Sequence, residues 1–147
     1  MALLSARSKA IAAAVAALTL AGTPAALANS GGVPAIPLNV GQETTGSNTG
    51  ASGFFTYTIS GSQLCFTLQA RNLSASAVAA HIHVAPRNVA GPVVIPLAVG
   101  SGTSWTVSGC KTVSAALLSA ISTDPGAYYV NVHTPTFPGG EIRGQLK

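Results

Sequence analysis

Residues 54–68 read FFTYTISGSQLCFTL, and this segment carries the clearest structural signal in the sequence. Apolar side chains occupy every second position before and after a Gly61-Ser62 pair: Phe55, Tyr57 and Ile59 on one side, and Leu64, Phe66 and Leu68 on the other. Alternation with a period of two is typical of a half-buried strand, and a two-residue break that contains Gly is typical of a hairpin turn. The stretch therefore predicts an antiparallel β-hairpin.

Short apolar runs separated by turns rich in Gly and Pro continue on the C-terminal side of this hairpin. We expect further strands over residues 78–84, 92–99, 102–107, 127–133 and 141–146. One helix is predicted over residues 114–121, with Asp124-Pro125-Gly126 after it as a stop signal. Short strands at regular spacing indicate a mainly β fold, either an antiparallel β-sandwich or a small Greek-key barrel with one short helix.

The first 28 residues have the pattern of a secretory signal peptide. Arg7 and Lys9 precede an uncharged run over residues 10–22, and Ala26-Leu27-Ala28 has the small-x-small form of a cleavage site. We expect cleavage after Ala28, a flexible lead-in over residues 29–35 and one domain over residues 36–147. The small, proline-containing stretch 29–37 suits a flexible lead-in or an edge segment. No second apolar run of spanning length follows, so the mature chain is predicted to lack a transmembrane segment and to be secreted or held in the cell envelope.

Charge is scarce: the chain has seven basic and three acidic side chains among 147 residues. Because Arg7 and Lys9 belong to the signal segment, five scattered cations remain against three carboxylates. Five scattered cations form no stripe that would neutralise a row of phosphates, so nucleic-acid binding is disfavoured. Three carboxylates are too few for an acidic calcium cage and leave little for two-carboxylate hydrolysis.

The two cysteines, Cys65 and Cys110, have two interpretations. Disulfides persist after export, so the simplest interpretation is one disulfide between the two cysteines. The alternative is two buried free thiols. Neither cysteine has another Cys or a His at zinc-knuckle spacing, which disfavours a metal site built on thiolates.

The three histidines fall on two of the predicted strands. Side chains alternate between the faces of a strand, so His81 and His83 point the same way, opposite the core side chain Ile82. By the same rule, Tyr128, Val130 and Val132 face the core, and the outward side chains of the strand at 127–133 are Tyr129, Asn131 and His133. On the last strand the outward side chains are Glu141, Arg143 and Gln145.

This polar face has two interpretations. One is a solvated outer sheet surface on which Arg143 pairs with Glu141. The other is a divalent metal site, because two histidines at i and i+2 can chelate an ion and His133 on a neighbouring strand can complete three nitrogen ligands. An all-imidazole set in an oxidising compartment suits copper or zinc. Asn131, Glu141 and Arg143 would then lie around the ligands, with Asn131 or Glu141 orienting a ring.

Catalytic templates are absent from the sequence. It contains no Gly-x-Ser-x-Gly elbow, no phosphate-binding glycine loop and no His-Glu-x-x-His motif. Asp124 is the single Asp, so a Ser-His-Asp triad is disfavoured. We therefore expect no catalytic residues and a protein that is not an enzyme.

Four blocks in chain order carry a family resemblance. They are residues 80–83 (AHIH), 91–97 (GPVVIPL), 128–134 (YYVNVHT) and 137–146 (FPGGEIRGQL). They resemble the signature blocks of the CHRD domain, which is named for its repeats in chordin, over roughly residues 36–146. The chain is most similar to secreted bacterial single-domain members, which also tend to carry one cysteine just after the first hairpin turn and another near the middle.

The resemblance implies an extracellular β-rich domain. In chordin it accompanies modules that bind bone morphogenetic proteins, but this chain lacks chordin's cysteine-rich repeats, so growth-factor antagonism does not transfer. The His-x-His strand is also loosely similar to the copper ligands of copper-zinc superoxide dismutases. The fourth copper histidine and the zinc loop of those enzymes are missing here, so that comparison supports metal binding alone.

The predicted function is thus an exported, non-enzymatic CHRD-type binding module with a copper or zinc site formed by His81, His83 and His133. Two alternatives remain at this point. One is a cell-envelope or extracellular interaction protein that binds a protein or glycan without metal, and the other is a copper-dependent redox enzyme.

Overall fold

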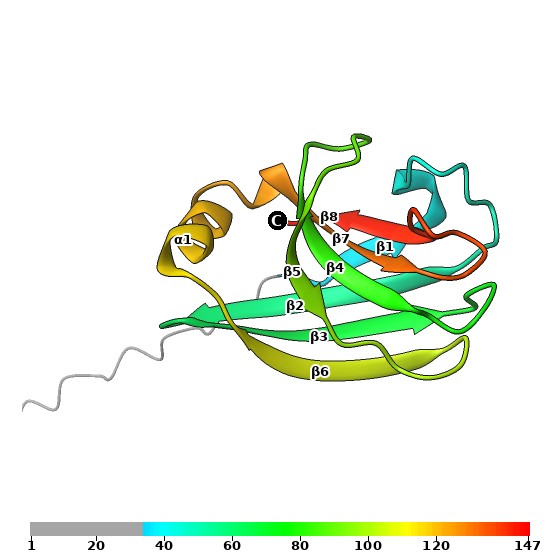
Figure 1. Ribbon diagram of the computed structural model, residues 1–147, viewed down its shortest axis with the longest axis horizontal. Helices are drawn as coiled ribbons and strands as arrows, with labels where there is room; N and C mark the ends of the chain where they lie inside the picture. The colour runs from blue at the N-terminus through cyan, green and yellow to red at the C-terminus, as the bar shows by residue number, and fades with distance from the viewer. Residues whose placement is uncertain (1–33) are drawn as a thin grey trace, which may run out of the picture.

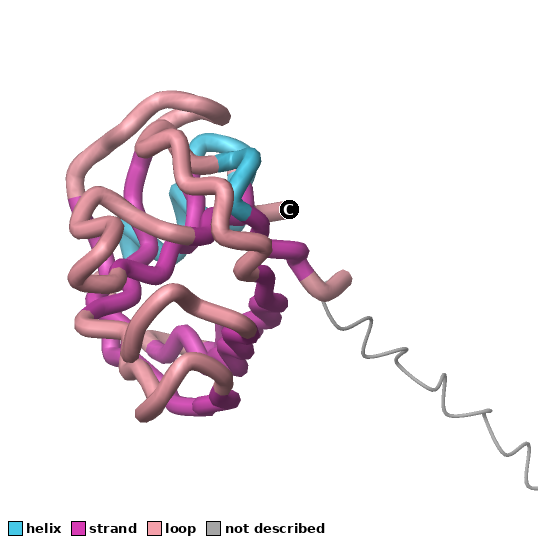
Figure 2. The backbone as a smooth tube through the Cα atoms, turned by 90° about the vertical axis from the view of Figure 1, so that its right-hand side faces the viewer, coloured by secondary structure: helices cyan, strands magenta, loops and turns pink. Residues whose placement is uncertain are grey.

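The structure, a computed structural model, describes residues 34–147. Its eight strands form one antiparallel sheet in the order β5-β4-β7-β8-β1-β2-β3-β6. The sheet curls until its two edge strands face each other, which gives a nearly closed barrel (Figure 1). In the view of Figure 2 the strands surround a common centre, which the buried apolar side chains fill. The expected mainly β antiparallel fold with one short helix is confirmed.

The strands and helices follow in chain order with short connections. They are β1 Ile36–Asn39, the 3-10 helix η1 Val40–Gln42, β2 Ser52–Ser60, β3 Gln63–Arg71, β4 Ala79–Val84, β5 Val93–Leu97, β6 Trp105–Thr112, α1 Ala115–Thr123, the 3-10 helix η2 Pro125–Ala127, β7 Tyr128–His133 and β8 Ile142–Gln145. The predicted signal peptide, its cleavage after Ala28 and most of the lead-in lie outside the described residues.

The hairpin at 54–68 forms as the alternation predicts. Strands β2 and β3 pair in register from Ser52↔Arg71 to Ser60↔Gln63, which leaves Gly61 and Ser62 as the turn. Gly61 has a φ of 58°, a conformation that glycine adopts without steric cost. Phe55, Leu64 and Leu68 point inward and are completely buried, so the period-two pattern correctly assigned the core face.

Strand β1 corrects the expectation of a flexible lead-in or edge segment at 29–37. It lies inside the sheet, between β8 and β2, and its two inward side chains, Ile36 and Leu38, are each 1% exposed. Pro37 lacks the amide hydrogen of an interior strand, but β1 pairs with β8 at only one position, Asn39↔Arg143, so little of that ladder is lost. The strand also passes close to Gly144, where a Cβ would lie 2.7 Å from the Pro37 carbonyl oxygen.

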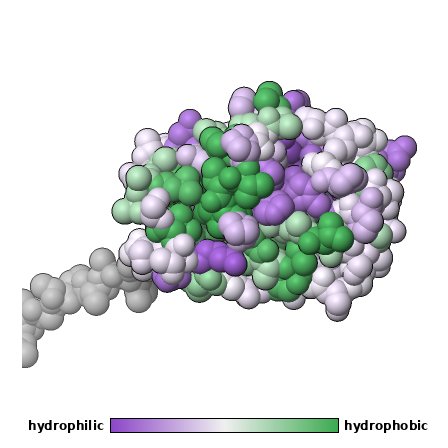
Figure 3. Space-filling model, viewed as in Figure 1, coloured by the Kyte–Doolittle hydropathy of each residue, from purple (hydrophilic) through white to green (hydrophobic). Residues whose placement is uncertain are grey.

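Helix α1 begins one residue later and ends two residues later than predicted. Its N-cap is Ser114, whose hydroxyl accepts a hydrogen bond from the Leu117 amide at 3.3 Å. The helix lies at one end of the barrel, where Leu118 and Ile121 are buried (Figure 1). The surface between α1 and β5 is strongly apolar (Figure 3). No helix within residues 34–147 is long and apolar enough to cross a membrane.

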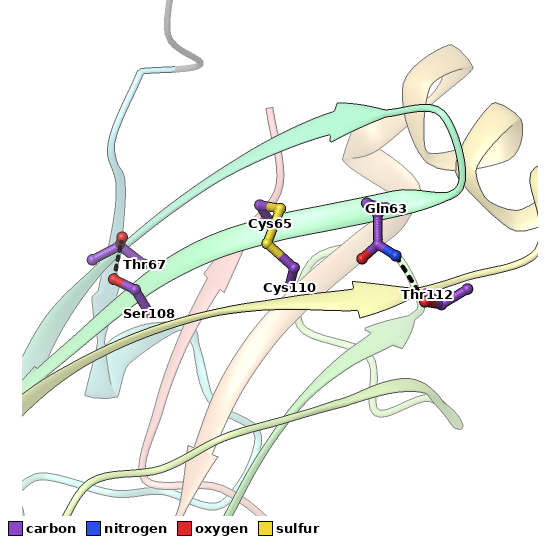
Figure 4. The surroundings of a disulfide bond; sticks show 6 residues. All are labelled: Gln63, Cys65, Thr67, Ser108, Cys110 and Thr112. Atoms are coloured by element: carbon purple, nitrogen blue, oxygen red, sulfur yellow. Dashed lines mark hydrogen bonds between the residues drawn. A yellow bond between two sulfur atoms is a disulfide. The ribbon is translucent and has the colours of Figure 1, made fainter.

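Strand β6 occupies Trp105–Thr112 instead of the expected 102–107, because the Gly-Cys-Lys segment continues the ladder with β3. Cys65 and Cys110 are direct partners in that ladder and form a disulfide, so the interpretation as two free thiols is wrong. Hydrogen bonds between Thr67 and Ser108 and from Gln63 to Thr112 flank the disulfide on the same outer face (Figure 4).

Candidate metal centre

The pairing of β4 with β7 brings the three histidines together. The register aligns His81 with Asn131, His83 with Tyr129 and Ala79 with His133, so His133 lies diagonally next to His81. Ile82 and Val132, which alternate with these histidines along the two strands, are completely buried in the core. All three imidazoles consequently project from the outer face of the barrel wall.

The imidazoles form a compact cluster. One ring nitrogen from each of the three histidines can be chosen so that these nitrogens all lie within 4.8 Å of one another. The Nδ1 atom of His81 is 3.1 Å from the Nε2 atom of His133. Edge-to-face contacts place the ring centroid of His81 5.4 Å from that of His83 and 4.9 Å from that of His133. The three histidines predicted as metal ligands therefore lie next to one another in the structure.

Main-chain carbonyls fix the orientation of two of the rings. His83 Nδ1 lies 2.8 Å from the Gly91 carbonyl oxygen, and His133 Nδ1 lies 2.9 Å from the Pro138 carbonyl oxygen. A carbonyl can only accept, so in each neutral ring Nδ1 carries the hydrogen and Nε2 carries a lone pair. The Nε2 of His133 then accepts from His81 Nδ1, whereas the Nε2 of His83 is buried and has no hydrogen-bond partner.

The environment favours neutral imidazoles, which are the form that binds metal. Burial lowers the pKa of His81, and the nearby His133 and His83 rings lower it further. Burial also lowers the pKa of His133, and the hydrogen bond to the Pro138 carbonyl opposes this shift only in part. At neutral pH both rings therefore present lone pairs instead of positive charge.

The polar face that carries the histidines is covered by protein, so the expectation of a solvated sheet surface is wrong. Every residue of β7 and β8 is buried, including those on the outward side of each strand. The loop over residues 85–91 crosses this face and accepts hydrogen bonds from it. Gly91, at the end of the loop, lies so close to the end of β4 that a Cβ atom at position 91 would collide with the Val84 carbonyl oxygen. His81 is the most accessible of the three histidines, since His83 and His133 are 6% and 8% exposed.

Arg143 holds this loop in place. Its guanidinium donates hydrogen bonds to the carbonyl oxygens of Pro86 at 2.9 Å and Val89 at 2.8 Å, and to Gln145 Oε1 at 3.1 Å. Its charged carbon lies 3.4 Å above the centre of the Tyr129 ring. The expected ion pair with Glu141 is absent, because both ends of that pair are engaged elsewhere.

Tyr129 connects Arg143 to the histidines. Its ring stacks on His83 with centroids 4.7 Å apart and an interplanar angle of 9°. Its hydroxyl accepts a hydrogen bond from the Gly91 amide at 3.2 Å. Because the Gly91 carbonyl accepts from His83, the loop and the Tyr129 ring together restrict the orientation of the His83 imidazole.

Glu141 is completely buried and joins three segments of the chain through its hydrogen bonds. Its carboxylate accepts hydrogen bonds from the hydroxyls of Thr49, Thr134 and Ser74 and from the Ser74 amide, at 2.7 to 2.8 Å. Burial alone would raise the pKa of this carboxyl, but these hydrogen bonds outweigh it and hold the pKa below its ordinary value. Glu141 thus remains charged without a cationic partner.

Asn131 lies between the histidines and a carboxyl that the sequence did not single out. Asn131 forms a hydrogen bond with Glu43. Burial raises the pKa of the Glu43 carboxyl, and the hydrogen bond with Asn131 and the charge of Arg143 offset that increase only in part. The Oδ1 atom of Asn131 and one carboxyl oxygen of Glu43 are buried without partners.

Some residues around the histidines could not be found from sequence. No periodicity marks Glu43, since it lies in the loop after η1. Likewise the Gly91 and Pro138 carbonyls are main-chain atoms that carry no sequence signal, whereas alternation did place Tyr129 on the histidine face.

Comparison with known proteins gives one result. The family model described as CHRD domain matches residues 35–146, which is nearly the whole described part of the chain. No curated protein and no solved structure gives a significant match.

Proposed function

This chain belongs to the CHRD domain family, and we propose that it is an exported, non-enzymatic binding module in which His81, His83 and His133 bind one copper or zinc ion. CHRD domains are generally non-enzymatic modules of the extracellular type, and the disulfide between Cys65 and Cys110 fits an oxidising location. The partner of the module is proposed to be an extracellular protein or glycan.

The observation that carries the metal proposal is the Nε2 atom of His83. A buried acceptor without a hydrogen bond is costly, and nearly all such atoms in proteins have a partner. This one belongs to the cluster of imidazoles, and a main-chain carbonyl holds the opposite nitrogen of the ring. This supports the proposal, because metal-binding histidines commonly have their second ring nitrogen oriented by an outer hydrogen bond.

The donor set restricts which ion would bind. Both cysteines are consumed by the disulfide, and no carboxylate belongs to the cluster of described residues that could hold a metal. Three neutral nitrogens suit zinc or copper and not calcium or magnesium, which prefer oxygen. Binding through His81 Nδ1 would require its proton to move to Nε2 and its hydrogen bond with His133 to open.

Calorimetric titration of the untagged mature chain with Cu(II) and with Zn(II) tests this proposal. Glycine as a weak competitor suppresses binding by the free amino terminus. We expect one ion per chain, and we expect His83→Ala to weaken the binding more than tenfold because it removes a ligand. Arg71→Ala, at the end of β3 and far from the histidines in the sheet order, is the control and should bind as the parent does.

Equal binding by the parent and His83→Ala would exclude the metal site and favour a metal-free interaction module. The copper-loaded protein should not turn over superoxide or peroxide. Turnover that a chelator abolishes would instead assign the copper redox alternative.

A further inference from the structure

The barrel is not closed by hydrogen bonds. Strands β5 and β6 are the two edges of the sheet, and no ladder joins them. Each therefore has one edge of main-chain amides and carbonyls without a strand partner, on the side that faces the other. At one end the gap is narrow, because Gly100 after β5 packs directly against Trp105 at the start of β6.

At the other end the two edges enclose a groove. Its volume is about 320 Å³, and its lining comes from β5, from the end of β6 and from the start of α1. The apolar side chains that line it are Val94, Ile95, Pro96, Val113 and Leu117. In Figure 3 the surface between α1 and β5 forms one broad hydrophobic area. Exposed apolar surface of this kind between two unpaired strand edges suits an extended chain.

Lys111 is the only charged side chain that lines the groove. It pairs with Leu64, which is completely buried, so the register directs Lys111 toward the inner face of the sheet instead of toward solvent. Its side chain is half-buried, and within residues 34–147 no carboxylate oxygen lies within ion-pair distance of it. A strand that pairs with β6 would place one of its inner-face side chains opposite this ammonium group.

A second copy of this chain does not offer that side chain. The sequence contains three carboxylate side chains. Glu141 is completely buried, Glu43 lies half-buried in the loop after η1, and Asp124 lies between α1 and η2. None of them is on an exposed strand, and two β6 edges would also bring like charges into one interface.

We propose that the groove between β5 and β6 is a strand-addition site, which binds an extended segment of a partner protein with apolar side chains on one face and a Glu or Asp among them opposite Lys111. The segment pairs with the free edge of β6 through main-chain hydrogen bonds. Its apolar side chains contact Val94, Val113 and Leu117. The site adjoins the histidine cluster, because Pro96, which lines the groove, is the β-ladder partner of His81, but the proposal does not require a bound metal.

A synthetic peptide, acetyl-Thr-Val-Thr-Glu-Thr-Val-Thr-amide, is the probe. As a strand it places two Val and the Glu on one face. We expect its addition to shift the NMR amide signals of β6 and the methyl signals of Val94, Val113 and Leu117, while the amide signals of β8 and β1, in the interior of the sheet order, stay in place. Replacing Glu by Lys in the peptide should weaken binding about fivefold, as should Lys111→Glu in the protein. Two N-methyl groups on the pairing edge of the peptide should weaken binding more than tenfold.

Arg71→Glu is the matched control, because it makes the same charge change at the end of the neighbouring strand β3. It should leave peptide binding unchanged. The proposal is overturned if the peptide causes no shifts at β6, if Lys111→Glu and Arg71→Glu have equal effects, or if the N-methylated peptide binds as well as the parent peptide. Signals of β6 that shift with protein concentration alone, together with a dimer in sedimentation, would assign the groove to a second copy and also overturn it.

Discussion

The two halves of the sheet use the same alternation of apolar and polar residues but differ in what covers their outer faces. In β2, β3 and β6 the exposed positions alternate with more buried ones along the strand, and the outer side chains are mostly Thr, Ser and Gln. In β7 and β8 every position is buried. The outer side chains of these two strands are Tyr129, Asn131, His133, Arg143 and Gln145, and loops lie over them.

This difference shows that polarity on the outer face of a strand has two structural uses. On the first half, side chains bond to one another across the strands, as Thr67 does with Ser108 at 2.7 Å. On the second half they bond to main-chain atoms of the covering loops, as Gln145 does with the carbonyl oxygens of Ala85 at 2.8 Å and Gly126 at 2.7 Å. The second use buries polar groups, so each of them contributes more to stability when satisfied and costs more when its partner is removed.

The largest expected loss of stability comes from removing the disulfide between β3 and β6, in the half of the sheet formed by β2, β3 and β6. Replacing Cys65 and Cys110 together by Ala should lower the free energy of unfolding by about 4 kcal/mol, because the bridge closes a loop of 45 residues in the unfolded chain. Denaturation in guanidinium, with and without reductant, measures this. The proposed ion binding should persist in the folded variant, since the bridge joins β3 and β6 and not the histidine strands. A loss below about 1 kcal/mol would contradict the expectation.

A matched pair of arginine variants compares the halves directly. Arg143→Met should lower the free energy of unfolding by about 3 kcal/mol, because the carbonyls of Pro86 and Val89 and the Gln145 amide oxygen lose their donor. Arg71→Met removes an exposed guanidinium at the end of β3 and should change it by less than about 0.5 kcal/mol. Urea denaturation of both variants is the measurement, and similar losses would mean that the covered half has no special dependence on its polar contacts.

Hydrogen exchange in the same Arg143→Met protein tests the cause. Residues 86–91 should lose protection while the amides of β3 and β6 keep theirs, because only the loop depends on the guanidinium. Uniform loss of protection would show that Arg143 stabilises the barrel as a whole and not the loop in particular.

The first half was predictable from sequence because its information is local. The alternation at 54–68 and the Gly61-Ser62 turn follow from neighbours in the chain. The disulfide was expected from the predicted export and the count of two cysteines, whereas the extension of β6 across Cys110 was not predicted. The helix was predicted nearly to its ends, since Ser114 caps it and Pro125 follows it. Strand β1 escaped notice because four residues that include Pro37 give too little alternation to read.

The second half was predictable only in part. Alternation correctly placed His81, His83 and His133 on one face, and cross-strand pairing brought them together. Alternation could not show that loops cover that face. Arg143 and His83 donate to main-chain carbonyl oxygens more than five residues away in the chain, and every residue type has such an oxygen, so no sequence pattern marks these contacts. The assumed pair of Arg143 with Glu141 was wrong for the same reason: opposite charges on one strand were read as partners, while loop atoms satisfied each of them.

Glu141 gives the covered half an acid dependence that the first half lacks. The pKa of this carboxyl is lower in the folded protein than in the unfolded chain, so the carboxylate stabilises the fold above the unfolded pKa of about 4.5. That contribution should be lost as the pH falls from about 4.5 through the lower folded pKa. Glu141→Gln should cost about 2 kcal/mol at neutral pH and should flatten this part of the curve of unfolding free energy against pH. An unchanged acid limb in the variant would assign the dependence to other groups.

The smallest expected effect comes from one substitution made on both halves. Thr67→Val removes an exposed hydroxyl that bonds to Ser108, and water can replace the lost bond, so the free energy of unfolding should change by less than about 0.5 kcal/mol. Thr134→Val removes a completely buried hydroxyl that donates to Glu141 at 2.7 Å and should cost about 2 kcal/mol, because no water reaches the carboxylate to replace it. Urea denaturation of the two variants isolates the effect of cover from the chemistry of the residue. Equal losses would show that the position of a hydroxyl under a loop has no energetic consequence, and the contrast between the halves would then be one of geometry alone.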